Sequence, residues 1–221
     1  MWSCQLHRKM NIALLALAIA SAPWFSLLFL QADVLAQTSQ ALHKGLFLVA
    51  NPELPDPNFR KSVVLICEYG SAGAIGLVLN KPTEIPLSKV LPSIPDIQKN
   101  RQTLFIGGPV QPKGLLMLFR FPTRVENTRP VMEGVYWGGN QKMVASMVLH
   151  PKPHEQFHIY AGYAGWAHGQ LEAEVAGGAW KTLPADTASI FEKDPETLWN
   201  NLFDRHTDSH RFISFPAQEF P

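Results

Sequence analysis

Ser62-Val-Val-Leu-Ile-Cys-Glu68 and Ala74-Ile-Gly-Leu-Val-Leu79 are two almost continuously apolar runs, separated by the turn Gly70-Ser-Ala-Gly73. Their length and β-branched composition predict β-strands, and the short separation predicts an antiparallel hairpin. Continuous apolar character is typical of a central strand that is covered on both faces. We interpret Cys67 as a buried core cysteine, because the sequence supplies no neighbouring base to activate its thiol.

Further strands are predicted on both sides of this hairpin. Upstream, Gly45-Leu-Phe-Leu-Val-Ala50 is an apolar run that ends at a proline-rich turn. Downstream, Thr103–Ile106 and Gly114–Phe119 are close enough in sequence to pair antiparallel with each other, and a strand pattern returns at residues 157–163. Strands with short connections come first and helices come late, which predicts an α+β fold and not an alternating, doubly wound sheet.

Three helices are predicted. A short one fits near Leu87 to Leu91, and residues 170–175 have helical spacing before Gly177-Gly178, which can end a helix. The last helix has the clearest start, because Asp194 is a suitable N-cap and Pro195 suits the first helical position. Its predicted apolar stripe consists of Leu198, Trp199, Leu202 and Phe203.

Composition limits the class of protein. The chain has 221 residues, of which 46% are hydrophobic and 17% charged, so it can build a core and is neither disordered nor collagen-like. A formal net charge of +1 gives no basic excess for binding phosphate backbones. Two cysteines are too few for a disulfide scaffold.

The N-terminus resembles an export signal. Basic residues precede an apolar run from Ile12 to Leu30, and Ala36 suits a cleavage site that would leave Gln37 first. The run is also close to the roughly 20 residues that span a bilayer, so an uncleaved anchor is the alternative. We therefore predict residues 1–36 to be a signal peptide or transmembrane anchor, and residues 37–221 to be a single domain with a short C-terminal tail, exported or membrane-anchored outside the cytoplasm. A mispredicted start codon would instead leave the domain in the cytoplasm.

The segment from His150 to His158 is the first candidate for chemistry. His150, His154 and His158 are spaced four apart, and imidazoles are ligands for zinc, nickel or copper. Two prolines between His150 and His154 prevent these two from sharing one helix, which favours a solvated loop. A metal-dependent or hydrolytic enzyme that uses this segment stays an alternative. No cofactor is predicted, and no residue is assigned as catalytic or as a metal ligand.

Two glycine-containing segments are candidate ligand or partner contacts. One is the turn after the strand at residues 103–106. The other is a segment in which small residues alternate with large aromatic ones, a pattern that suits a tight corner of the core, which we favour, or a ligand-binding surface. Loops of this kind commonly carry binding residues. The predicted contacts are Gly107, Gly108, Pro109, Gly162, Tyr163, Gly165 and Trp166. Glu172 and Glu174, just beyond, are predicted on different helix faces and do not form an acid/base pair.

Six blocks occur in order along the chain: Gly45-Leu-Phe-Leu-Val-Ala-Asn-Pro52 with Asp56-Pro57 and Phe59, Ser62-Val-Val-Leu-Ile-Cys-Glu68, Gly76-Leu-Val-Leu-Asn-Lys-Pro82, Gly107-Gly-Pro-Val110, Gly162-Tyr-Ala-Gly-Trp166 with Gly169-Gln-Leu-Glu172, and Leu198-Trp199. Together they resemble the YqgE/AlgH family from Gly45 to Phe203. The resemblance implies one α+β domain with a bent, mainly antiparallel, barrel-like sheet and helices packed around it. The chain departs from the family pattern at Tyr69, where many members have histidine.

The resemblance implies little chemistry. Members are mostly uncharacterised, and one is described as a regulator of alginate synthesis and transcription, with no catalytic residue to carry over. We therefore expect a non-catalytic binding or regulatory protein whose partner is an unknown protein or small molecule. A DNA-linked transcriptional regulator is a further alternative, but a formally neutral domain without a helix-turn-helix signature does not favour direct nucleic-acid binding. Residues 12–30 supply the membrane contact if they are not cleaved.

Overall fold

The structure is a computed structural model that describes residues 41–211, with side chains as far as Arg205. This part of the chain forms ten strands, five α-helices and one 3-10 helix. In chain order they are β1 (Leu46–Ala50), β2 (Val63–Gly70), β3 (Gly73–Val78), β4 (Pro82–Pro86), α2 (Leu87–Val90), η1 (Ile97–Lys99), β5 (Thr103–Ile106), β6 (Val110–Arg120), β7 (Thr128–Met132), β8 (Val135–Gly138), α3 (Gln141–Leu149), β9 (Gln156–Trp166), α4 (Gln170–Ala176), β10 (Trp180–Pro184), α5 (Thr187–Phe191) and α6 (Pro195–Arg211).

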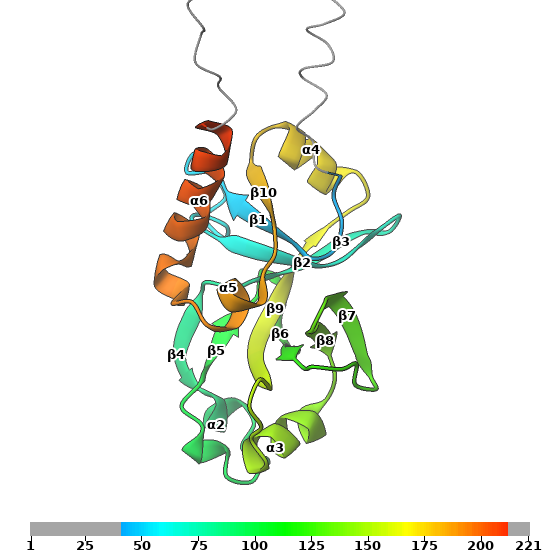
Figure 1. Ribbon diagram of the computed structural model, residues 1–221, viewed down its shortest axis with the longest axis vertical. Coiled ribbons are helices and arrows are strands. Elements are labelled where there is room, and N and C mark those ends of the chain that lie inside the picture. The colour runs from blue at the N-terminus through cyan, green and yellow to red at the C-terminus, as the bar shows by residue number, and fades with distance from the viewer. Residues whose placement is uncertain (1–40, 212–221) are drawn as a thin grey trace, which may run out of the picture. The chain divides into compact units, whose positions relative to one another are not determined.

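The strands form one bent sheet in the order β10-β1-β2-β3-β9-β6-β8-β7, with β5 also beside β9 and β4 beside β5 (Figure 1). Every pairing is antiparallel except that of β5 with β9. The path ends at β10 and β7, which do not pair with each other, so the sheet is not closed. The predicted α+β class, with a bent and mainly antiparallel sheet, is confirmed.

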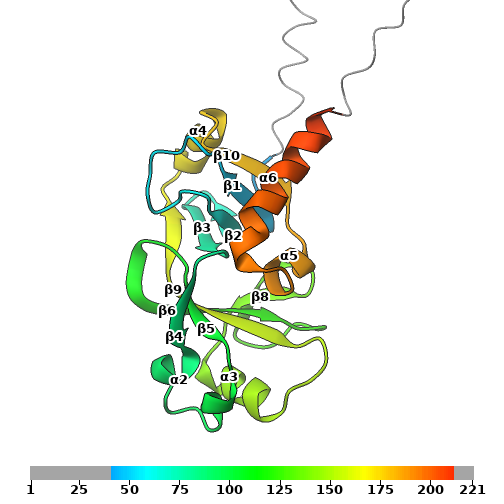
Figure 2. The same cartoon turned by 90° about the vertical axis from the view of Figure 1, so that its left-hand side faces the viewer.

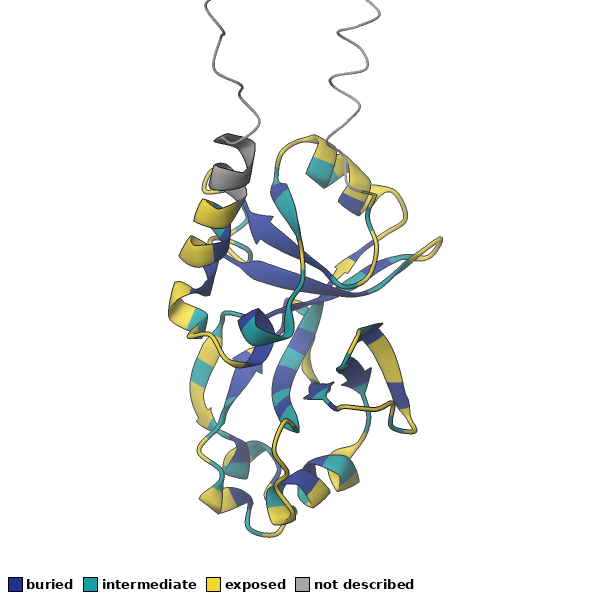
Figure 3. Cartoon of the chain, viewed as in Figure 1, coloured by how far each residue is buried: buried dark blue, intermediate teal, exposed yellow. Residues whose placement is uncertain are grey.

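Strand β9 connects the two halves of the sheet. Its last residues pair with β3, whereas most of its length pairs with β6. Gly162 lies between these regions with φ of 69°, a conformation that favours glycine. The two halves enclose a central core that contains Phe47, Leu65, Leu77, Leu118, Trp137 and Tyr160. Figure 3 shows the continuous buried stretches of β1 and β2 beside this core.

Two further cores cover the outer faces of the sheet. One lies beside α2 and α3 and includes Leu87, Met117, Phe119, Val144 and Ile159. The other lies beside α4 and includes Leu48, Ile66, Ala74, Trp166 and Trp180. Alternate residues of β2 enter the central core and the core beside α4, which confirms the prediction of a central strand buried on both faces.

Helix α6 runs along β1 and β10, as Figures 1 and 2 both show. Its predicted stripe packs against the central core, and the Trp199 indole donates a hydrogen bond of 2.9 Å to the Ala50 carbonyl. The predicted N-cap is confirmed, because the Glu196 amide donates to Asp194 Oδ1 at 3.0 Å. Helix α4 also ends where predicted, at Gly177.

The predicted pairing between residues 103–106 and 114–119 is wrong. The β2–β3 hairpin forms as expected, with Leu65 opposite Leu77, but β5 and β6 lie on either side of β9 and do not pair. The chain between them crosses over the backbone of β9 at Gly108, and this crossing carries β6 to the far side. Short sequence separation therefore did not produce a hairpin here.

No helix within residues 41–211 combines the length and apolar character needed to cross a membrane. The longest one, α6, has 17 residues and exposes charged side chains such as Glu196 and Asp204. For the described residues, this finding corrects the predicted transmembrane anchor and the exported or membrane-anchored location. The predicted signal peptide or anchor itself, residues 1–36 with the apolar run 12–30, lies outside the described residues.

Candidate functional site

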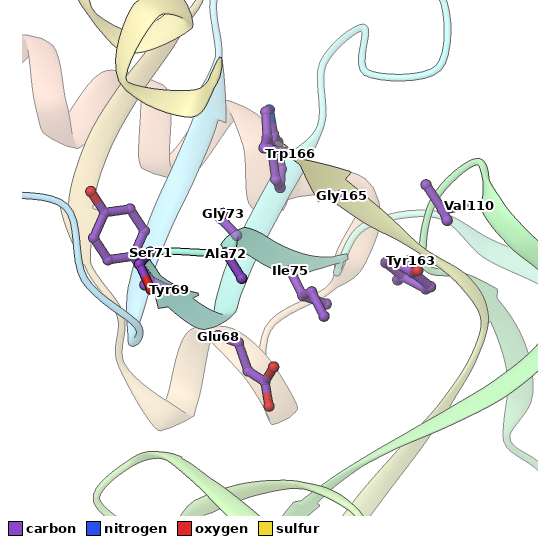
Figure 4. Close-up of a pocket in the computed structure, with 12 residues that line it drawn as sticks. Glu68, Tyr69, Ser71, Ala72, Gly73, Ile75, Val110, Tyr163, Gly165 and Trp166 are labelled. Atoms are coloured by element: carbon purple, nitrogen blue, oxygen red, sulfur yellow. The ribbon is translucent and has the colours of Figure 1, made fainter. Parts of the chain in front are cut away.

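A cleft lies where the tip of the β2–β3 hairpin meets the end of β9 (Figure 4). Its volume is about 550 Å³, and it is open to solvent. The residues around it come from three strands, one turn and the start of β6. They are Glu68, Tyr69, Gly70, Ser71, Ala72, Gly73, Ala74, Ile75, Val110, Tyr163, Gly165 and Trp166. The predicted corner thus supplies three cleft residues, and the predicted turn is followed directly by a fourth, Val110.

A β-bulge aims Glu68 at the cleft. Ile66 lies opposite Gly76 and Glu68 lies opposite Ile75, which leaves Cys67 as an extra residue without a partner. Because side chains alternate along a strand, the extra residue turns Glu68 toward the face that carries Ile75. Figure 4 shows these two side chains on one side of the hairpin, with Tyr69 on the other.

The floor of the cleft lies at Gly165, which has no side chain. Gly165 lies opposite Ile75, so Glu68, Ile75 and Gly165 form one row across β2, β3 and β9. A Cβ atom on Gly165 would lie 3.3 Å from Cε2 of Tyr163, which places the Tyr163 ring directly beside the empty position. Along this row, the carboxylate of Glu68 is followed by the apolar side chain of Ile75. Next comes the hollow at Gly165, which the ring of Tyr163 bounds.

The cleft carries one charged group. The Glu68 carboxylate pairs with the Arg129 guanidinium of β7, which in turn lies 5.5 Å from the centre of the Trp137 ring. Among the residues that line the cleft, Glu68 is the only side chain charged at neutral pH. Tyr69 points to α4, where its hydroxyl donates to Glu172 Oε1 at 2.5 Å. This hydrogen bond raises the pKa of Tyr69 and lowers that of Glu172.

The two predicted contact segments meet, but chiefly through their backbones. A Cβ on Gly107 would lie 2.3 Å from the Gly162 carbonyl oxygen, and a Cβ on Gly108 would lie 2.2 Å from the Tyr163 carbonyl carbon. Gly107, Gly108 and Gly162 are buried, whereas Pro109 is exposed and does not line the cleft. These glycines allow the crossing over β9 that places Val110 and Tyr163 at the cleft.

Trp166 is the last cleft residue of β9, but its side chain lies on the face of the sheet opposite Ile75, in the core beside α4, where Glu174 holds it. The indole N–H groups of Trp166 and Trp180 both donate to Glu174 Oε2, at 2.9 and 2.8 Å. Gln170 donates to the other oxygen of the same carboxylate at 2.9 Å. Glu172 and Glu174 thus have different partners on different faces of α4, as the sequence predicted.

The three predicted histidines are not brought together. His150 follows α3 and is exposed, His154 is exposed with φ of 68°, and His158 lies on β9. Within the part of the chain that the structure describes, no three His, Cys, Asp or Glu side chains are placed to hold a metal ion. His158 stacks on Phe105 with ring centres 4.9 Å apart and contacts the ring of Phe191. The segment therefore provides an aromatic contact at His158 and an exposed turn before it.

Acid is expected to destabilise the protein through His158. Burial among aromatic rings lowers the pKa of His158 from 6.5 to about 4. Between these values the unfolded chain binds a proton that the folded chain does not, so the free energy of unfolding falls as the pH falls from 6.5 to 4. After allowance for partial exposure, we expect a loss of about 2 kcal/mol. Urea unfolding at several pH values should show that the free energy of unfolding declines less steeply with falling pH in His158→Phe than in the wild type. The exposed control His150→Gln should match the wild type. Equal slopes for all three proteins would contradict this prediction.

Sequence reasoning missed three of the cleft residues that matter most, namely Glu68, Ile75 and Val110. Glu68 belongs to a strand that is otherwise apolar, and a carboxylate at the end of such a strand is a signal that could have marked it. Its direction could not be predicted, because the bulge at Cys67 depends on the pairing register with β3. Cys67 itself is fully buried, and burial followed by the nearby Glu68 carboxylate raises the pKa of its thiol.

Comparison with known proteins gives one consistent result. Residues 47–210 match a family model described as AlgH-like. A UPF0301 protein of Thioalkalivibrio sulfidiphilus is 39% identical over 157 residues, which cover 69% of this chain and 83% of that protein. A UPF0301 protein of Chlorobium chlorochromatii is 33% identical over 179 residues, covering 79% of this chain and 92% of the relative.

Solved structures agree with the fold. The solution structure of the AlgH protein from Pseudomonas aeruginosa superposes with a TM-score of 0.63 at 28% identity, covering 82% of this chain and 99% of that one. The crystal structure of a protein from Corynebacterium diphtheriae superposes with a TM-score of 0.64, covering 77% of this chain and 90% of that chain. At 24% identity the second structure supports the fold alone.

Proposed function

The chain belongs to the AlgH-like family, and on that premise we propose that it is a non-catalytic binding or regulatory protein that receives its partner in the cleft between the β2–β3 hairpin and β9. The observation that carries this proposal is the row Glu68, Ile75 and Gly165. Gly165 has no side chain beside Ile75 and the ring of Tyr163, and this leaves a hollow in which a group of another molecule can take the place of the missing side chain.

The chemistry of the lining favours binding over catalysis. The lining residues include a serine, Ser71, but no histidine, lysine or cysteine that could activate it as a nucleophile. The nearby thiol of Cys67 is buried with a raised pKa, which keeps it in the unreactive protonated form. Glu68 is paired with Arg129 and has no second carboxylate in the lining to form an acid/base pair.

Filling the hollow is expected to weaken binding while the fold is kept. Valine suits a strand, and its Cβ at position 165 would meet the movable ring edge of Tyr163 at 3.3 Å and Val110 Cγ2 at an ordinary contact distance of 3.6 Å, so we expect Gly165→Val to change stability by less than about 1 kcal/mol. The test is an NMR titration of the isotope-labelled full chain with three six-carbon probes: hexan-1-ol, hexylammonium and hexanoate. At least one probe should shift the backbone amides of Ile75, Tyr163 and Gly165, and Gly165→Val should weaken its binding by about fivefold or more.

The matched control is Thr182→Val, which places the same side chain on β10, three strands away from β3 in the sheet. This variant should bind the probes as the wild type does. The proposal is overturned if none of the three probes shifts the cleft amides, or if Gly165→Val binds them as well as the control.

A further inference from the structure

We infer that the cleft binds a primary ammonium group carried on an alkyl chain, and that its source is a lysine side chain of a partner protein. This inference rests on the proposed binding role and adds the chemistry of the partner. It follows from three features of the cleft: its charge, the number of free carboxylate oxygens and the apolar surface beside them.

The charge of the lining selects a cation. Glu68 is the only charged residue of the lining, and its side chain is 37% exposed, so it is accessible to a ligand. Arg129 neutralises it in part from β7 but does not line the cleft. A cationic ligand is attracted by this carboxylate, whereas an anionic ligand would find no cation on the lining.

The free oxygen of Glu68 selects an ammonium over a guanidinium. Arg129 Nη1 occupies Oε1, and Oε2 has no hydrogen-bond partner among the described residues. A guanidinium is recognised best by two parallel hydrogen bonds to both oxygens of one carboxylate, and only one oxygen is available. An ammonium is a compact charge that needs only one such acceptor.

The apolar part of the cleft matches the stem of a lysine. Ile75, Val110 and the ring of Tyr163 lie beside the hollow at Gly165. Lysine commonly lays its four-carbon stem along apolar surface while its charged end reaches a polar group. A stem placed over Gly165 would point along the row toward Glu68, because Gly165, Ile75 and Glu68 lie opposite one another on adjacent strands.

The NMR titration with the six-carbon probes tests the charge preference. Hexylammonium should bind the full chain about fivefold more tightly than hexan-1-ol, and hexanoate should bind more weakly than either. Glu68→Gln, which has the same size, should remove this preference. The control Glu133→Gln, which alters an exposed carboxylate between β7 and β8, should retain it.

A second variant is expected to strengthen the binding of hexylammonium, and this test remains valid even if Glu68→Gln does not fold. Arg129→Gln frees both oxygens of Glu68, so it should bind hexylammonium about twofold or more tightly than the wild type does. If Arg129→Gln gains nothing, or if hexan-1-ol binds as tightly as hexylammonium, the inference is overturned while cleft binding, and with it the proposed function, stands.

The source of the ammonium is tested with two further probes. Nα-acetyl-lysine methylamide presents the side chain as a protein would, and putrescine presents the same alkyl stem with a second charge at its other end. The lysine derivative should bind more tightly, because a second ammonium would be placed against the apolar surface beside Gly165. Tighter binding of putrescine would identify a free diamine as the ligand and overturn the protein partner.

Discussion

Replacing Gly108 with alanine is expected to destabilise the fold by about 4 kcal/mol or more, a large part of the stability of a domain of this size. A Cβ at this position would lie 2.2 Å from the carbonyl carbon of Tyr163 and 2.4 Å from the amide nitrogen of Ala164. Both atoms belong to the backbone of β9, which pairs with β3 and β6 and cannot move away without loss of these pairings. Gly108 also has φ of 151°, which side-chain-bearing residues rarely adopt.

A matched control separates the crossing from the general cost of replacing glycine. Gly178 has φ of 78°, but nothing lies within 4 Å of the position that its Cβ would occupy. Gly178→Ala should therefore lower the free energy of unfolding by only about 1 kcal/mol, because alanine is strained in this backbone conformation. Both variants are measured by urea unfolding followed through tryptophan fluorescence. A Gly108→Ala protein as stable as Gly178→Ala would contradict the close crossing over β9.

The crossing also organises the proposed binding site. It places Val110 opposite Tyr163 on the side of β9 that faces away from β3. Gly165 is two residues beyond Tyr163. It is accessible to solvent and lies between Ile75 on one side and Val110 and Tyr163 on the other. The glycines of the crossing are thus structural, and two cleft residues follow them closely in sequence, Val110 after Gly108 and Tyr163 after Gly162. This relation explains why the predicted contact segments lay near the cleft although several of their glycines are buried.

Local patterns in the sequence predicted the elements that local forces determine. The β2–β3 hairpin follows from two apolar runs and a glycine turn, and the start of α6 follows from the Asp194 cap and Pro195. Strands β4, β7, β8 and β10 and helices α3 and α5 were not predicted, because most of them are only four or five residues long. In such short segments neither helical nor strand periodicity can be recognised.

Features that depend on long-range pairing could not be predicted. The parallel pair of β5 and β9 joins residues that are more than fifty positions apart, and it replaces the expected hairpin with β6. The direction of Glu68 depends on one extra residue in β2, and a shift of one residue moves a side chain to the opposite face. The candidate site was therefore predicted only where glycine spacing marks it, and its carboxylate was missed.

Replacing Glu174 with alanine is expected to destabilise the protein by about 3 kcal/mol. The Glu174 carboxylate accepts hydrogen bonds from the indole nitrogens of Trp166 and Trp180, and these two side chains are 6% and 3% exposed. Alanine leaves both N–H groups of these buried indoles without this acceptor, and a buried donor without a partner costs about 1–3 kcal/mol. The free energy of unfolding, measured with urea, should fall accordingly.

Two further variants show whether the carboxylate acts through these indoles. Glu174→Gln keeps one oxygen, which can accept from both indoles as Oε2 does, so it should cost less than half as much as Glu174→Ala. Glu172→Ala removes the neighbouring acidic residue of α4, whose carboxylate accepts a hydrogen bond from Tyr69 at an exposed surface, and should cost less than about 1 kcal/mol. Equal losses for Glu172→Ala and Glu174→Ala would mean that helix α4 as a whole, and not the shared acceptor, holds Trp166 in the core beside α4. A larger loss for Glu174→Ala would instead mean that this one carboxylate, eight residues after Trp166 in the sequence, fixes the positions of both indoles at the end of β9.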